Sequence, residues 1–376
     1  MPEDKKEEGK EEDDEEPQEQ VEFLGKAPKR KETRVSYFHP PLPKPTKKFD
    51  PEDKKEKFNY IPGHYVTLRF DIDGNDVRRS YSMCSSPFLN EPIRIAVKRV
   101  ENGLVSNYLN DSVKVGDEIG VMPPHGSFLL ETGQGQNTYV AFAAGSGITP
   151  IWSMIKSVLE KESQSKFVLF YGNQTTETII FKKEIEALEG DRLAVHHILS
   201  KEDTSNSIMS GRINKSKATA LLGMDLTVSQ VKAFYMCGPE GMIMEVKDAL
   251  HDLGVSDDRI NFELFTTPVI EKEGSVGDHT EFMGIAKVKV IYDEEETEFE
   301  LASVGENVLE AAMRNDVDAP FSCKGAVCCT CKAKVTEGKM IMDANYALSD
   351  EEVAEGFVLA CQAHPASENV VLDFDE

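Results

Sequence analysis

The chain has 376 residues with 42 basic and 67 acidic side chains, a formal net charge of −25 at pH 7. This length predicts roughly two or three domains, each able to bury its own core. The acidity argues against a nucleic-acid binder, and no uncharged apolar run reaches the ~18 residues of a membrane span. Since the first residues lack the apolar core of a secretory signal, we expect a cytoplasmic protein without membrane insertion.

The charge is distributed unevenly along the chain. Residues 1–16 hold ten acids and three lysines, a composition that cannot offset the entropy of ordering by burying apolar surface. We therefore predict a disordered charged tail over residues 1–29, which either solubilises the chain or serves as a docking arm. The proline-rich residues 39–45 predict an extended connector or an inserted loop.

Five of the seven cysteines lie close together near the C-terminus. Cys323 and Cys328 are separated by four residues, Cys328 and Cys331 by two, and Cys331 and Cys361 by 29. This is the spacing of a plant-type [2Fe–2S] cluster, in which one tight loop supplies three thiolates and a distant strand supplies the fourth. The alternatives are a zinc site or inert core cysteines, but zinc usually binds paired C-x2-C knuckles and only one such pair is present. Cys329 is then a neighbouring free thiol that could substitute as a ligand in a damaged or mutated cluster.

Residues that suit a flavin occur in the first third of the chain. Residues 60–70 predict a turn and a strand, and residues 78–83 predict a second strand with Arg79 and Tyr81 on one side. A flavin needs an aromatic face, a cation for its pyrophosphate and a hydroxyl at its N5 edge. A short helix begins at Gly103, where backbone N–H groups and Ser106 can hold phosphate. Residues 114–128 predict the short strands of a small β-barrel.

Strands alternate with helices in the middle of the chain, which favours a doubly wound parallel sheet. The first strand runs into a glycine turn and a helix, an arrangement that presents a helix N-terminus to phosphate. The predicted strands cover residues 139–144, 166–173, 194–199 and 233–239, and the predicted helices 151–161, 179–189 and 240–254. Towards the C-terminus, residues 285–301 predict two strands joined by an acidic turn and residues 306–317 a helix.

These landmarks together resemble the ferredoxin–NADP reductase superfamily, in the order of its oxygenase-reductase branch. In that family R-x-Y-S binds flavin, G-x-G-x-T-P and C-G-P-x-x-M bind the nicotinamide nucleotide, and a Phe ends the reductase part. The matching runs are Arg79-Ser80-Tyr81-Ser82, Gly145-Ser146-Gly147-Ile148-Thr149-Pro150, Cys237-Gly238-Pro239-Glu240-Gly241-Met242 and Glu263-Leu264-Phe265.

The resemblance implies a multidomain fold of β and α/β units. An antiparallel FAD-binding β-barrel would span residues 30–133 and a parallel-sheet NAD(P)-binding domain residues 134–268. A linker over 269–284 would lead to a β-grasp ferredoxin domain over 285–376. His64, Ala326 and Cys329 depart from the family, which usually has Gln, Gly and a small residue other than Cys at these places.

The resemblance also implies roles for single residues. Arg79 would hold the FAD pyrophosphate, Tyr81 would stack on the ring and Ser82 would contact its N5 edge. Thr149 and Cys237 would place the nicotinamide, so that Ser82 and Cys237 are the predicted catalytic residues. The predicted cofactor-binding set is completed by Ser80, Gly103, Val105, Ser106, Gly145, Ser146, Gly147, Pro150, Gly238, Pro239 and Phe265.

Two features bear on the coenzyme and the acceptor. Ser200, Lys201 and Arg212 lie near predicted strand ends, where they could grip a 2′-phosphate, and they favour NADPH over NADH. The runs 342–348 and 356–365 are similar to those of reductases that serve ring-1,2-phenylacetyl-CoA epoxidases, which implies a non-haem iron oxygenase as partner. The alternatives are a reductase for another hydroxylase, a desaturase or an electron carrier, or a redox sensor that uses the cluster as a switch.

Much of the acidity belongs to the predicted ferredoxin domain, where twenty acids and seven bases give residues 285–376 a net charge of −13. An acidic face around an electron donor suits steered docking to a basic partner, although the charge could equally serve solubility.

Overall fold

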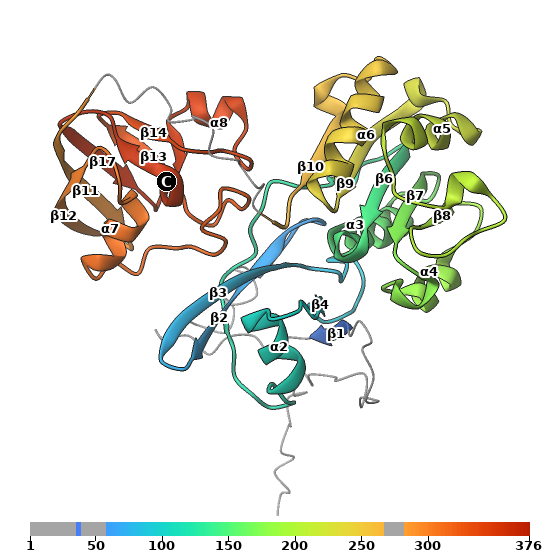
Figure 1. Cartoon of the computed structure of the whole chain (residues 1–376), viewed down its shortest axis with the longest axis horizontal. Coiled ribbons are helices and arrows are strands. Elements are labelled where there is room, and N and C mark those ends of the chain that lie inside the picture. The colour runs from blue at the N-terminus through green and yellow to red at the C-terminus, as the bar shows by residue number, and fades with distance from the viewer. Residues whose placement is uncertain (1–34, 39–57, 267–281) are drawn as a thin grey trace, which may run out of the picture.

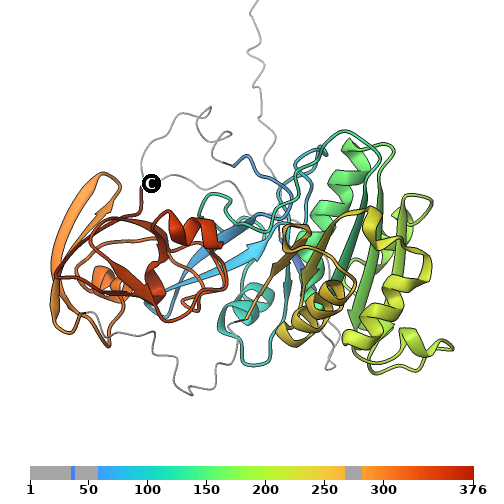
Figure 2. The same cartoon turned by 90° about the horizontal axis from the view of Figure 1, so that it is seen from above.

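The computed structural model describes residues 35–38, 58–266 and 282–376. The predicted tail, the proline-rich connector and most of the predicted linker lie outside these ranges. Figures 1 and 2 show three units, with the β2–β3 hairpin of the first unit reaching towards the C-terminal unit.

The first unit consists of antiparallel strands, which form the predicted barrel. One sheet has the order β3-β2-β5 and the other pairs β1 with β4, and a bridge between Met83 and Ile95 joins the two. The turn before β2 and the helix that starts after Gly103 occur where the sequence predicts them. The elements are β1 (Val35–Phe38), β2 (Tyr65–Ile72), β3 (Asn75–Ser82), β4 (Ile95–Lys98), α2 (Leu104–Asp111) and β5 (Gly120–Val121).

The second unit is the predicted doubly wound sheet. Its five strands are parallel in the order β10-β9-β6-β7-β8, with α3 and α4 on one face and α5 and α6 on the other. The strands are β6 (Thr138–Ala144), β7 (Lys166–Asn173), β8 (Leu193–Leu199), β9 (Val231–Cys237) and β10 (Ile260–Glu263). The helices are α3 (Ile148–Lys161), α4 (Lys182–Leu188), α5 (Lys215–Asp225) and α6 (Glu240–Asp252).

The helix expected from residue 179 begins three residues later. Thr175 and Thr178 form a capping box around a short 3-10 turn, and Phe181 takes a left-handed conformation with φ +61° before α4 starts. Ile180 and Phe181 are buried in the core instead of lying on the helix. Burial of these side chains therefore outweighs their helical spacing. Helix α5 is not predicted from the sequence, because its weak amphipathic pattern gives little signal.

The third unit has the predicted β-grasp architecture, a five-stranded mixed sheet of order β12-β11-β17-β13-β15 packed on α7. The Asn307 side chain accepts a hydrogen bond from the Glu310 N–H and so caps the start of α7. The elements are β11 (Ile285–Tyr292), β12 (Glu295–Ala302), α7 (Val308–Arg314), β13 (Lys332–Glu337), β14 (Met340–Met342), α8 (Asp350–Ala354), β15 (Phe357–Leu359), β16 (Ala363–Pro365) and β17 (Asn369–Asp373).

Candidate cofactor sites

Strand β3 carries the predicted flavin residues. Arg79 is exposed, its Nη1 donating to the Arg78 carbonyl at 2.7 Å, and Tyr81 is half-buried. Burial raises the pKa of the Tyr81 hydroxyl, and the charge of Arg79 acts on it in the opposite direction. An aromatic ring and an accessible cation therefore lie together, as the binding of a flavin nucleotide requires.

The end of β3 contacts the parallel-sheet unit through the carboxyl group of Glu263. The Ser82 hydroxyl donates to Glu263 Oε2 at 3.1 Å, and desolvation raises the pKa of Glu263 to about 8. Glu263 pairs in register with Cys237 on the neighbouring strand. Cys237 is fully buried, and burial together with the charge of Glu263 keeps the pKa of its thiol well above the ordinary value. The two predicted catalytic residues thus share one acidic neighbour.

The predicted nicotinamide motifs meet through close backbone packing. Gly145 to Gly147 form a 3-10 turn between β6 and α3, and Gly145 has φ +55°. A Cβ on Gly147 would lie 2.0 Å from the Cys237 carbonyl oxygen, and one on Gly238 would lie 3.0 Å from the Ala144 Cβ. Because neither position has room for a side chain, the ends of β6 and β9 come together beneath the N-terminus of α3. This arrangement fits a nucleotide phosphate.

Thr149 and Pro150 lie in the first turn of α3 and are buried. The Thr149 hydroxyl donates to the Ser146 carbonyl at 3.0 Å, which fixes the glycine turn. At the other motif, Pro239 is exposed and precedes α6. Phe265 is 40% exposed and follows the end of β10. Its side chain is therefore partly accessible two residues after Glu263.

Two polar side chains near the carboxyl ends of β6 and β7 also suit a bound nucleotide, and the sequence did not predict them. Asn173, at the end of β7, is buried, and its Nδ2 has no hydrogen-bond partner among the described residues. A Cβ on Gly145 would lie 3.6 Å from Nζ of Lys98, so this ammonium group from β4 lies beside the glycine turn. A buried amide donor and a cation both fit a nucleotide, but neither belongs to a motif.

The residues predicted to select NADPH converge at the end of β8. Ser200 and Lys201 follow the strand, and the Gly211 N–H donates to the Leu199 carbonyl at 2.8 Å, which brings Arg212 to the same end. Ser200, Lys201 and Arg212 are exposed. The nearby Glu202 accepts from the backbone N–H and hydroxyl of Thr176, at 2.8 and 2.7 Å.

At the start of α2, backbone N–H groups rather than a side chain are available to bind a phosphate. Gly103 is its N-terminal cap, with no side-chain capping bond, and Val105 and Ser106 are buried in the first turn. The Ser106 hydroxyl accepts from the Val100 N–H at 3.1 Å. A Cβ on Gly103 would lie 2.5 Å from that hydroxyl, which explains the glycine. A phosphate at this turn would therefore meet N–H groups, with Ser106 holding the loop.

The four predicted cluster cysteines are brought together as two pairs. Cys323 and Cys328 have sulfurs 3.1 Å apart, and the thiols of Cys331 and Cys361 hydrogen-bond to each other. The Gly325 N–H points at the Cys323 sulfur at 3.3 Å. The Cys328 thiol and several backbone N–H groups lower the pKa of Cys323 to about 6. The Cys331 thiol likewise lowers the pKa of Cys361, so one sulfur of each pair favours the thiolate form.

The paired geometry suits a two-iron cluster, with two thiolates for each iron. In the part of the chain that the structure describes, no three His, Cys, Asp or Glu side chains converge on one point as a single metal ion requires. Lys324 and Ala326 take left-handed conformations, with φ 51° and 63°, to wrap the loop. Cys329 points away from the pairs, with its sulfur 3.4 Å from the Ala347 carbonyl oxygen.

The cysteine loop lies against the flavin unit. The Ser80 hydroxyl donates to the Ser322 hydroxyl at 2.8 Å, and the hydroxyls of Tyr65 and Thr330 are 2.9 Å apart. Tyr65 pairs in register with Ser82, the residue that contacts Glu263. The candidate flavin and cluster sites are therefore separated by the width of a few side chains.

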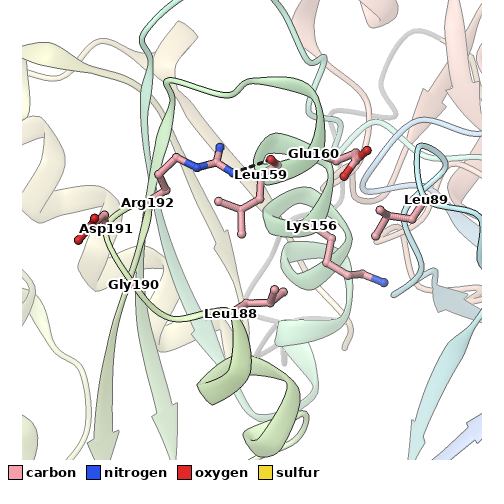
Figure 3. A pocket seen from close by; sticks show the side chains of 8 residues that line it. All are labelled: Leu89, Lys156, Leu159, Glu160, Leu188, Gly190, Asp191 and Arg192. Atoms are coloured by element: carbon pink, nitrogen blue, oxygen red, sulfur yellow. Dashed lines mark hydrogen bonds between the residues drawn. The ribbon is translucent and has the colours of Figure 1, made fainter.

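A cavity of about 530 Å³ lies elsewhere, beside the C-terminal half of α3 (Figure 3). Arg192 and Lys156 both line it. The Arg192 guanidinium donates to the carbonyls of Leu159 and Glu162 at 2.7 and 2.9 Å, and the Lys156 ammonium group pairs with Glu91. Both cations hold neighbouring elements together. The glycine turn is at the opposite end of α3, so this cavity is separate from the nicotinamide motifs.

Comparison with known proteins matches three family models to the three units. They are an oxidoreductase FAD-binding domain over residues 45–129, an oxidoreductase NAD-binding domain over 142–248 and a 2Fe-2S iron-sulfur cluster binding domain over 291–366. A 1,2-phenylacetyl-CoA epoxidase component from Escherichia coli K12 is 37% identical over 86% of this chain and 91% of its own.

The ferredoxin reductase component of 3-ketosteroid-9-alpha-monooxygenase from Rhodococcus rhodochrous is 30% identical over 86% of this chain and 90% of its own. The chain belongs to the oxygenase-reductase branch of the ferredoxin–NADP reductase superfamily. This reductase is an NAD(P)H-dependent oxidoreductase that uses FAD and a [2Fe–2S] cluster and serves as the electron-transfer component of an oxygenase system.

The reductase also shares its fold with a solved structure, phthalate dioxygenase reductase. The TM-score is 0.53 and the identity 21%, over 94% of this chain and 97% of the other. The predicted order of barrel, parallel-sheet domain and ferredoxin domain is thereby confirmed. Among the described residues, no helix is long and apolar enough to span a membrane.

Glu263 predicts a specific pH dependence of stability. The folded reductase keeps this carboxyl protonated up to its raised pKa of about 8, whereas the unfolded chain ionises near 4.5. The unfolded state therefore binds fewer protons over this interval, and the free energy of unfolding falls as pH rises, by at most about 1.4 kcal/mol per pH unit. Replacing Glu263→Gln should remove that fall, so the variant gains stability relative to wild type towards pH 8.

Thermal unfolding of the FAD-loaded reductase and the variant across this pH range measures the effect. Glu160→Gln, which changes an exposed carboxylate on α3, is the control and should follow the wild-type profile. A constant difference between Glu263→Gln and wild type at every pH would contradict the assignment.

Proposed function

We propose that this reductase transfers electrons from NADPH to the oxygenase of a phenylacetyl-CoA epoxidase system. The observation that carries the proposal is the 37% identity to the Escherichia coli component of such a system, which extends over nearly the whole of both chains. The 3-ketosteroid monooxygenase relative, at 30%, supports the oxygenase class with a different substrate. The acidity of the ferredoxin domain favours a basic docking patch on the acceptor. A cytoplasmic location remains a prediction from the sequence.

The cofactors supply the electron chemistry, because FAD accepts two electrons with a hydride and gives them up one at a time to a [2Fe–2S] centre. The protein has to hold and order them. We assign Arg79 to the FAD pyrophosphate and the first turn of α2 to a phosphate group. Tyr81 would stack on the flavin ring, and Ser80 lies beside it on the same flavin-binding strand. The exposed cation beside the half-buried ring supports the assignments of Arg79 and Tyr81.

Ser82 and Glu263 form a proton-carrying pair in this proposal. The Ser82 hydroxyl would face the N5 edge of the flavin, and Glu263, whose pKa is about 8, holds a proton at neutral pH. A neutral carboxyl can donate to Ser82 Oγ as well as accept from it. The pair can therefore supply a hydrogen bond at N5 without placing a negative charge there.

Cys237 and the glycine turn orient the nicotinamide. The buried Cys237 remains a thiol, since its pKa lies well above the ordinary value, and it presents a small uncharged surface. The N-terminus of α3, Lys98 and the amide of Asn173 surround the place where coenzyme phosphates would lie. Pro239 and Phe265 border the same edge and complete the proposed pocket.

We assign Cys323 and Cys328 to one iron and Cys331 and Cys361 to the other, following the two thiol pairs. Replacing Cys361→Ser should abolish the cluster, seen as lost visible absorbance and lost iron, and keep FAD binding and NADPH-dependent ferricyanide reduction. Cys329→Ser is the matched control and should retain about two irons per chain. A cluster that survives in Cys361→Ser, or is lost in Cys329→Ser, would overturn the ligand assignment.

The coenzyme preference follows from the end of β8. Arg212, Ser200 and Lys201 supply donors for a 2′-phosphate, while Glu202 is engaged by Thr176. We expect NADPH to have a higher kcat/KM than NADH, and Arg212→Ala to raise KM for NADPH about tenfold with little effect on NADH, as for one charge-assisted hydrogen bond. Lys215→Ala, which removes a nearby cation paired with Asp252, is the control. A clearly higher kcat/KM for NADH would contradict the preference.

The acceptor is tested by reconstitution. The purified reductase, mixed with the oxygenase subunits of a phenylacetyl-CoA epoxidase, should oxidise NADPH in a manner that depends on phenylacetyl-CoA and should yield the ring epoxide. The control replaces these subunits with the oxygenase of a 3-ketosteroid monooxygenase and its steroid. Coupled turnover only with the steroid system, or copurification from the native host with another oxygenase alone, would refute the specific acceptor.

A further inference from the structure

Arg78, the residue before the proposed FAD ligand Arg79, has a different environment from its neighbour. Its side chain is only 4% exposed, whereas Arg79 is exposed. Alternation along β3 turns Arg78 and Ser80 to the same face, and both contact the ferredoxin domain there. Arg78 and Ser80 therefore face the ferredoxin domain, whereas Arg79 and Tyr81 of the proposed flavin site lie on the opposite face of the strand.

Arg78 uses its whole guanidinium group at the domain boundary. Nη2 pairs with Asp318 of the ferredoxin domain and with Asp76 of its own strand, the latter at 2.8 Å. Nη1 donates to the Ala319 carbonyl at 3.4 Å, and the guanidinium carbon lies 4.2 Å from the centre of the Phe321 ring. Charge, hydrogen bonding and stacking therefore act together on one short segment.

That segment leads directly into the cysteine loop. Asp318, Ala319, Phe321 and Ser322 all contact β3, and Cys323 follows at once. Phe321 and Ser322 are buried. A displacement of the segment would carry Cys323 with it and would change the separation between the flavin-binding strand and the cluster.

Arg69 makes a weaker version of the same contact. It pairs with Asp318 at 2.8 Å and with Asp76 at 3.0 Å, but its side chain is 46% exposed. No contact joins it to Ala319 or Phe321 among the described residues. Exposed ion pairs contribute little to stability, so of the two arginines Arg78 contributes more to the attachment of this segment.

We propose that Arg78 is a positioning residue which, through Asp318, Ala319 and Phe321, holds the cluster loop against the flavin-binding strand for electron transfer between the two cofactors. The inference rests on the flavin and cluster assignments proposed above, and it is independent of the identity of the acceptor. Electron transfer rates fall steeply with distance, so a loosened segment slows this step and leaves the reduction of FAD by NADPH unchanged.

The test uses the holoreductase without any oxygenase. Asp318→Asn removes the exposed partner of the pair and keeps the fold, and Arg78→Gln and Arg78→Lys change the buried partner. In anaerobic stopped-flow experiments with NADPH, Asp318→Asn and Arg78→Gln should reduce the flavin at the wild-type rate and the cluster about tenfold more slowly. Arg78→Lys should be intermediate, since it keeps the charge but loses the planar fork.

Hydrogen exchange provides a readout besides activity. Amides of residues 318–330 should exchange faster in Asp318→Asn and Arg78→Gln, with no change in α7 (residues 308–314) as an internal reference. Arg69→Gln is the matched control and should affect neither measurement. Wild-type cluster reduction and exchange in both variants would overturn the proposal, as would an equal effect of Arg69→Gln. A failed reconstitution with the phenylacetyl-CoA epoxidase subunits would count against the proposed acceptor and would leave this test unaffected, since no oxygenase enters it.

Discussion

The nicotinamide, a two-electron donor, and the [2Fe–2S] cluster, a one-electron acceptor, both have to reach the same flavin. The flavin unit therefore has to contact the other two units at different places. Strand β3 satisfies this requirement by joining all three units. Its residue Ser82 contacts Glu263 of the parallel-sheet domain, and Ser80 contacts Ser322 of the ferredoxin domain. The adjacent strand adds the contact between Tyr65 and Thr330. One hairpin, β2–β3, therefore contacts both of the other units, and it is visible between them in Figures 1 and 2.

The two boundaries of the flavin unit differ in chemistry. Towards the parallel sheet, core residues such as Phe128 and Leu130 join the same hydrophobic cluster as Ile151 and Trp152 of α3. Towards the ferredoxin domain, the described contacts are mainly hydroxyl pairs and the network around Arg78. Apolar burial favours a permanent attachment, whereas a polar boundary specifies orientation with less buried apolar surface. The described contacts of the flavin unit with the nicotinamide unit are therefore mainly apolar, and those with the cluster unit are mainly polar.

Local patterns predicted most of the fold. Cysteine spacing identified the cluster loop, and alternating strands and helices identified the parallel sheet, because both signals are contained in short stretches. Contacts between distant segments had no such signal. Glu263, Lys98 and Asn173 acquire a role only when the ends of separate strands come together. The late start of α4 at Phe181 and the left-handed Ala326 likewise reflect tertiary packing that prevails over local preference.

The central claim is that the cluster receives electrons from the flavin of its own chain through the docked arrangement. An anaerobic stopped-flow experiment tests this directly: the reductase is mixed with NADPH at one fixed saturating concentration, and bleaching of the cluster after reduction of the flavin is followed over a wide range of protein concentration. Transfer within one chain predicts a first-order rate that does not change on dilution. A rate that falls in proportion to protein concentration would show transfer between separate molecules and would contradict it.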